Sequence, residues 1–239
     1  MFRADMRYQP INRDTFLHTV QPALLRADMQ ELCDTVRHHW APMQLCSLLT
    51  DDSADTRRLA CLALGLIGDR HLCNCLAHAL RDADAHVAHL AEHALWSIWL
   101  RSGASHVSGT FRTALDAMES GQLTLAVEQL HHVVEADPGF AEAYNQCAIA
   151  HYLLEQWEQA ITDGRQATEL MPVHFGAWAG MGHAHVQLGA MDQAAQCYRR
   201  ALKIHPRTPE IASALNRIER CGADLAVSIT DGPITRPIQ

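Results

Sequence analysis

Residues 175–208 read FGAWAGMGHAHVQLGAMDQAAQCYRRALKIHPRT, and residues 141–174 read AEAYNQCAIAHYLLEQWEQAITDGRQATELMPVH. Both frames are 34 residues long, they follow one another without a gap, and a third frame covers 107–140. Small residues recur at positions 8 and 20 of each frame, and a proline recurs at position 32. Small side chains let two antiparallel helices approach closely, and a proline ends the second helix. The period therefore predicts three stacked helix pairs.

The last frame carries the fullest set of marker residues, namely Trp178, Met181, Gly182, Ala194, Tyr198, Ala201 and Pro206. This set resembles the tetratricopeptide repeat, a helix-turn-helix unit whose stacked copies form a superhelix. The middle frame departs from the family pattern with His151 and Gly164 at positions 11 and 24, and the first frame departs with Thr110 and Val133. We expect an irregular first repeat and a packing gap near Gly164.

The segment that follows the third frame begins like a fourth repeat and then stops. In residues 209–220 the apolar side chains of Ile211, Leu215 and Ile218 fall on one face of a helix, so we predict a capping helix over the exposed edge of the third repeat. Residues 221–239 show no helical period and contain glycine and two prolines. They are predicted to form an extended or disordered tail.

The first half of the chain repeats differently. Residues 48–69 align with residues 79–100 at an offset of 31, and an acidic turn in each supplies a helix N-cap. The pattern resembles the short HEAT-like repeats of phycobilisome lyases and bacterial adaptor proteins, and residues 14–41 predict further helices. The predicted architecture is an all-α solenoid with a HEAT-like region at 1–106 and a tetratricopeptide domain at 107–220, whose helices could stack as one continuous superhelix.

Composition narrows the classes of function. The 27 acidic residues outnumber the 19 basic ones, the formal charge is −8, and no basic cluster occurs, so nucleic acid is not expected as a partner. The N-terminus lacks an apolar run of signal-peptide length, and no uncharged stretch approaches the ~20 residues that span a bilayer. We expect a cytoplasmic protein without a membrane partner, whose eight cysteines are small core residues.

The stretch HLCNCLAH at residues 71–78 has the composition of a metal site but the wrong geometry. Cys73 and Cys75 lie about 200° apart on a helix and cannot both reach one zinc ion through ~2.3 Å bonds. His71, Cys75 and His78 share a face, but the two histidines are ~10 Å apart along the axis. This stretch is therefore predicted to be a polar face beside a core cysteine.

A second histidine stripe, His86, His89 and His93, lets only its closer pairs share an ion. A HEAT-repeat hydroxylase binds iron through His-Glu pairs at this place, whereas here Leu90 follows His89 and the carboxylates are missing. No phosphate-binding glycine loop or catalytic triad stands in a credible context. We therefore predict a non-enzymatic chain with no cofactor, no metal ligands and no catalytic residues.

The tetratricopeptide resemblance implies that positions 2, 5, 9, 12 and 13 of each first helix face the concave surface; position 2 of the middle frame is Glu142. From these positions we predict a partner-binding groove set of Phe111, Leu115, Met118, Asn145, Ile149, Tyr152, Leu153, His183, Val186 and Gln187. None of the concave positions is Lys or Arg, whereas chaperone-binding members of the family clamp a terminal carboxylate with basic residues. Acidic C-terminal tails are therefore not expected to bind, and an apolar peptide or an amphipathic helix is.

The most economical function is that of an adaptor or scaffold that binds another protein in the concave groove. The alternative is a non-catalytic regulatory subunit or chaperone of one specific enzyme. A further alternative concerns the groove itself, which the chain's own N-terminal segment or its tail could fill, the latter through Leu225, Val227 and Ile229.

Overall fold

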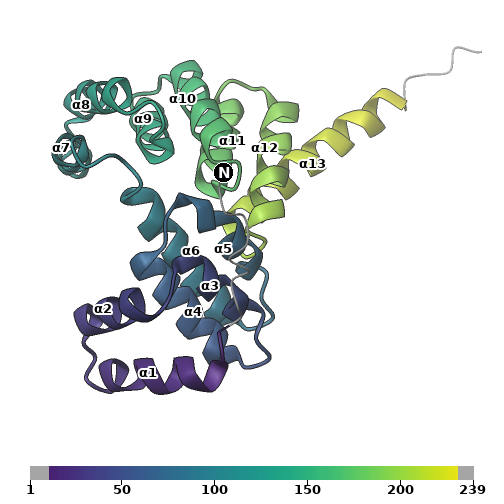
Figure 1. The fold of residues 1–239 in the computed structure, drawn as a ribbon. Coiled ribbons are helices and arrows are strands. Elements are labelled where there is room, and N and C mark those ends of the chain that lie inside the picture. The colour runs from purple at the N-terminus through teal and green to yellow at the C-terminus, as the bar shows by residue number, and fades with distance from the viewer. Residues whose placement is uncertain (1–10, 231–239) are drawn as a thin grey trace, which may run out of the picture.

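The computed structural model describes residues 11–230, with side chains to residue 220, and all regular structure within this span is helical. The all-α prediction is confirmed (Figure 1). The N-terminal region (residues 11–106) contains α1 (Arg13–Leu25), α2 (Met29–His39), α3 (Pro42–Leu45), the 3-10 helix η1 (Cys46–Thr50), α4 (Ala54–Ile67), the 3-10 helix η2 (Arg70–Leu72), α5 (Cys73–Ala79) and α6 (Ala85–Leu100). None of the described helices is long and apolar enough to cross a membrane.

The C-terminal region (residues 107–230) contains α7 (Ser108–Glu119), α8 (Leu123–Ala136), α9 (Ala141–Leu153), α10 (Trp157–Leu170), α11 (Phe175–Gln187), α12 (Met191–Ile204) and α13 (Pro209–Thr230). Helices α8, α10 and α12 begin at residues 123, 157 and 191, so the helix starts recur every 34 residues. The turn before each of them holds one residue at positive φ: Gly121 at 75°, Glu155 at 61° and Gly189 at 72°. The same backbone turn is thus built three times, and in the middle repeat a glutamate adopts the conformation that glycine adopts most easily.

The expected packing gap near Gly164 is wrong. A Cβ atom at Gly164 would lie 2.6 Å from Cγ of Met181, so the methionine of the next repeat already fills the space. The space beside Gly182 is occupied in the same way, by the ring of Tyr198. The other departure in the middle repeat, His151, is buried. Its Nδ1 lies 2.7 Å from a carboxylate oxygen of Asp163, which satisfies the buried ring nitrogen. Polar pairing replaces the usual aromatic contact at this position.

In the N-terminal region, two helices repeat the same local chemistry. Helices α4 and α6 begin at residues 54 and 85, 31 residues apart, and the side chains of Ser53 and Asp84 cap them. Two arginines of α4 bind the turn before α6 through paired hydrogen bonds: Arg57 to Asp82 at 2.6 and 2.9 Å, and Arg58 to Asp84 at 2.6 and 3.2 Å. The hydrogen bonds from Arg58 lower the pKa of Asp84 to about 2. This arrangement suits the HEAT-like resemblance, which stays a prediction.

The N-terminal region does not continue into the first tetratricopeptide-like repeat as one stack. Helix α6 packs instead on α9, and the N-terminal core takes in Ala141, Met171 and Phe175 from the second and third helix pairs. A second contact comes from the end of α12, where Nε2 of His205 lies 3.3 Å from a carboxylate oxygen of Glu92 on α6. One edge of the C-terminal solenoid therefore rests across α6.

One buried cluster forms the centre of this contact. Glu142 and His174 are fully buried, and Nε2 of His174 lies 2.8 Å from a Glu142 oxygen. Since Nδ1 of His174 accepts the backbone N–H of Ala177, Nε2 carries the proton and donates to the carboxylate. The indole of Trp99 on α6 stacks on the imidazole, with ring centroids 4.0 Å apart. Glu142 was predicted to face the groove, and this is corrected because α6 covers that end of α9.

The capping prediction for residues 209–220 agrees with the packing of α13, whose Ile211 and Leu215 are 8% and 9% exposed against the third repeat. The tail prediction is wrong for residues 221–230, because α13 continues as a helix to Thr230. A single glycine, Gly222, costs a helix only about 1 kcal/mol, and the next proline in the sequence is Pro233. The rest of the predicted tail, residues 231–239, lies outside the described residues.

The cap should contribute measurably to stability. Truncation after Thr208 exposes the apolar surface that Ile211 and Leu215 cover, so we expect the melting temperature to fall by several degrees for a loss of ~1 to 3 kcal/mol. Truncation after Arg220 keeps these contacts and is the matched control, with a melting curve close to that of the full chain. An unchanged curve and a monodisperse product after truncation at Thr208 would show that the segment is not a cap.

Candidate functional site

Two adjoining cavities lie along the first helices of the second and third repeats. The larger, here called the main pocket, has a volume of about 710 Å³ between α11, α12 and α13, and Tyr152 of α9 closes one end. The smaller, here called the side pocket, measures about 130 Å³ between α9 and α11. Tyr152 and His183 line both cavities, so the two lie next to each other.

The structure brings together six of the predicted groove residues. The main pocket is lined by Tyr152, His183, Val186 and Gln187, and the side pocket adds Asn145 and Ile149. Their common origin is the register of α9 and α11, whose equivalent positions are separated by one 34-residue period. The predicted positions on these two helices therefore lie on the face that carries the cavities, and their role in binding stays a prediction.

The remaining four predicted groove residues lie outside both pockets. Phe111 is 5% exposed and packs on the ring of Phe140, with centroids 4.7 Å apart, in the core of the first repeat. Leu115 and Met118 are partly buried against the same core. Leu153 is 53% exposed and lines neither cavity. The candidate site is thus confined to α9 and the helices that follow it.

A histidine–tyrosine hydrogen bond stands at the centre of the main pocket. The Tyr198 hydroxyl lies 2.8 Å from Nδ1 of His183. Burial raises the pKa of Tyr198 to about 12, which keeps the hydroxyl protonated as a donor. Burial also lowers the pKa of His183, and the nearby Arg217 lowers it further, which keeps the ring neutral as an acceptor. The two groups satisfy one another and leave their apolar surfaces to a ligand.

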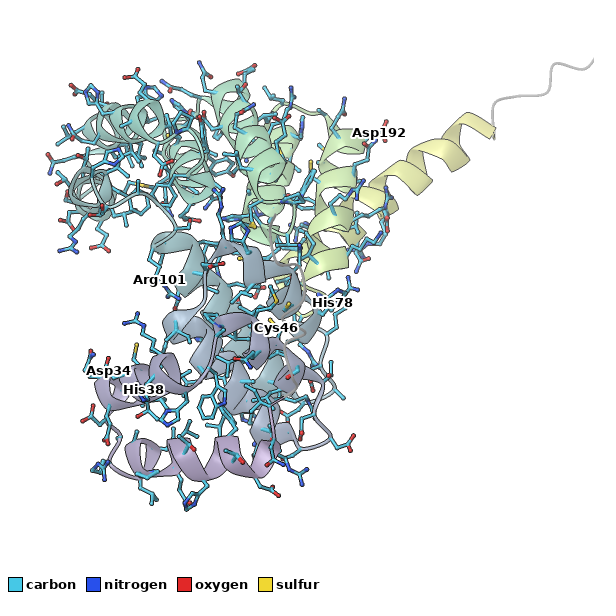
Figure 2. All side chains as sticks on the ribbon, viewed as in Figure 1. Asp34, His38, Cys46, His78, Arg101 and Asp192 are labelled. Carbon is cyan, nitrogen blue, oxygen red and sulfur yellow. The ribbon has the colours of Figure 1, made fainter. Side chains whose placement is uncertain are left out.

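Charged residues reach the main pocket from helices that the groove prediction did not consider. Arg199 and Glu219 form an ion pair at 2.7 Å, and Arg217 and Asp192 stand beside it (Figure 2 labels Asp192). They come from α12 and α13, whereas the prediction used only the first helix of each pair. The lining therefore contains two cations and two anions, although none of the predicted concave positions is Lys or Arg.

The apolar lining from α12 and α13 was also missed. Met191 and Ala195 are one helical turn apart on α12, and Ala214 and Ile218 are one turn apart on α13. This spacing was the available signal, because i and i+4 residues share a face. For α13 the prediction placed these apolar residues in the core alone. Ile218 both packs on the third repeat and lines the pocket.

Cys73, His71 and His78 of the HLCNCLAH stretch lie as the helical arc predicts, whereas Cys75, predicted on the polar face, is half-buried against the N-terminal core. Cys73 is 1% exposed in the N-terminal core, while His71 and His78 are exposed (Figure 2 labels His78). Among the residues that the structure describes, no three His, Cys, Asp or Glu side chains are grouped to hold a metal ion.

Comparisons with known proteins agree with the repeat period. Residues 176–207 match the family model described as tetratricopeptide repeat. The chain is 30% identical over 97 residues to anaphase-promoting complex subunit 3 of Schizosaccharomyces pombe, covering 40% of this chain and 15% of that protein. It is 24% identical over 108 residues to a TPR repeat-containing protein of Rhizobium etli, covering 45% and 53%. The chain thus spans about half or less of the length of these relatives.

A solved structure shows the same fold. The Sgt2 TPR domain from Aspergillus fumigatus superposes with a TM-score of 0.50 at 16% identity, over 57% of this chain and 91% of that one. This likeness shows a helical-repeat fold for the C-terminal region, and the family match covers its third repeat. The matched segment of the family model contains His183, Val186, Gln187 and Tyr198, so part of the candidate site lies on a family repeat.

The lowered pKa of His183 predicts a pH dependence of stability. The unfolded chain takes up the proton near the ordinary pKa of ~6.5, and the folded protein takes it up only at lower pH, so stability falls as the pH drops through that range. We expect His183→Gln to flatten the decline of unfolding free energy between about pH 7 and pH 5, measured by urea denaturation. A His183 ring that titrates at or above its ordinary value by NMR would contradict this assignment.

Proposed function

We propose that this protein is a non-catalytic adaptor that holds an apolar segment or an amphipathic helix of a partner protein across the main and side pockets. The observation that carries the proposal is that Tyr152 and His183 line both cavities, so that one ligand could contact the two. A ligand that follows this line would contact three successive first-helix positions, α9, α11 and α13, as a peptide laid along a solenoid does.

The chemistry of the lining favours an apolar ligand. Val186, Met191 and Ile218 contribute aliphatic surface, and of the charged side chains in the lining Arg199 and Glu219 are paired with each other. Burial of apolar surface then supplies most of the affinity, at roughly 25 cal/mol per Å². The charged groups at the end formed by α12 and α13 would set the orientation of the ligand and its rate of association.

The free thiols of the described cysteines suit a reducing compartment, which supports a cytoplasmic location. Occupation of the groove by the chain itself stays an alternative. For residues 221–230 it would require α13 to unwind or to bend back, because these residues extend the capping helix. The termini at 1–10 and 231–239 lie outside the described residues, so this alternative is tested by truncation.

Alanine substitutions in the lining should weaken partner binding. Tyr152→Ala combined with Val186→Ala removes two anchors, each worth ~1 to 3 kcal/mol, so we expect a loss of affinity of at least tenfold. The partner would be recovered by pull-down and identified by mass spectrometry, and its affinity measured by isothermal titration calorimetry. Leu153→Ala should have a smaller effect, because Leu153 is 53% exposed outside the lining.

The matched control combines Leu125→Ala with Leu170→Ala. These two leucines are 39% and 40% exposed, and neither lines a pocket. Deletion of residues 1–10 or 231–239 distinguishes self-occupation, which predicts tighter partner binding by one truncated form. The proposal fails if the control pair weakens binding as much as the Tyr152 and Val186 pair. It also fails if an acidic C-terminal peptide binds tightly and ignores the lining substitutions.

A further inference from the structure

Two histidines of α6 approach one another on an exposed face. His89 and His93 are one helical turn apart, and their Nε2 atoms lie 3.1 Å from each other. The rings are nearly perpendicular, with an interplanar angle of 88° and centroids 4.4 Å apart. Both side chains are exposed to solvent, so an ion can enter without rearrangement of the core.

We propose that His89 and His93 form a two-histidine chelate for a late divalent transition-metal ion, with Cu²⁺ bound most tightly and Ni²⁺ and Zn²⁺ more weakly. Metal–imidazole bonds of about 2.0 to 2.1 Å to two nitrogens 3.1 Å apart correspond to an angle of about 98° at the metal. That angle lies between the values for square-planar and tetrahedral coordination, so the distance between the nitrogens already suits either geometry. The preference for Cu²⁺ follows from the general order of affinities of nitrogen ligands.

The surroundings of the pair indicate binding without hydrolytic chemistry. The sequence His89-Leu90-Ala91-Glu92-His93 has the spacing found in one class of zinc peptidases, in which the glutamate acts as the base. Here Glu92 faces the C-terminal region, where it lies 3.3 Å from Nε2 of His205.

No third protein ligand joins the pair among the described residues. His86, one turn before His89, lies beside Asp84, with its Nδ1 3.9 Å from the carboxylate. No group of three candidate ligands is found in this part of the chain. Water would occupy the remaining coordination positions, which makes the site open and its binding reversible.

The test is a titration of the full chain with Cu²⁺ in a glycine-containing buffer that competes for loosely bound ions. Calorimetry should reveal one saturable site, and electron paramagnetic resonance should show coupling to two imidazole nitrogens. We expect His89→Ala and His93→Ala each to weaken this site by about tenfold or more, since even outer-shell partners of metal ligands change affinity by 10- to 100-fold. The melting temperature without metal should not change, because both side chains are exposed.

The control variant carries His131→Ala and His132→Ala. These histidines of α8 are also exposed, but they are adjacent in sequence, so they point about 100° apart and cannot close on one ion. The control should bind Cu²⁺ as the unmodified chain does. The proposal is overturned if the unmodified chain shows no saturable site, if either single substitution leaves the site intact, or if the control loses it.

Discussion

The buried pair of Glu142 and His174, covered by Trp99, is the constraint on which the arrangement of the rest of the molecule depends. A carboxylate without solvent is costly unless its oxygens are hydrogen-bonded, and removal of one partner of a buried pair typically costs ~3 to 5 kcal/mol. Glu142 is satisfied by His174 and by the side-chain amides of Asn145 and Gln146, at 3.2 and 2.6 Å. These hydrogen bonds join α9 to His174, the N-cap of α11, and α6 covers the pair with the indole of Trp99.

This constraint also determines the shape of the candidate site. Helices α9 and α11 are held at their first turns by α6, and the side chains that line the pockets, Tyr152, His183 and Val186, stand toward their last turns. A groove with walls held in this way loses little conformational entropy on binding, which favours affinity for a partner segment. The cap completes the wall, since Ile218 serves both the third repeat and the main pocket.

The sequence alone was informative where a period governs the structure. The 34-residue repeat predicts that Tyr152 and His183 share one face, and both line the two cavities, because register along a helix decides which face a residue occupies. It fails where a distant helix intervenes: Glu142 occupies a groove position in its frame, yet α6 covers it. It fails again for Arg217 on the pocket wall, because the groove positions were taken from the three full repeats alone and not from α13.

The expected gap near Gly164 shows a third kind of limit. A missing side chain in one repeat was read as empty space, but a flexible methionine, Met181, reaches in from the next repeat. The predicted tail at residues 221–230 shows another error, because α13 continues to Thr230. The prediction gave Gly222 too much weight as a helix breaker. Both errors arise from assigning to a single position what neighbouring residues decide.

We infer that the buried pair couples α6 to the second and third repeats. Native-state hydrogen exchange, read by mass spectrometry, measures this coupling. Segments covering α6, α9 and α11 should share one opening free energy, and Glu142→Ala should lower protection in all three by a similar amount, while α1 and α2 change less. The account would be contradicted if α9 and α11 kept their protection in Glu142→Ala, or if α6 opened independently of them in the unmodified protein.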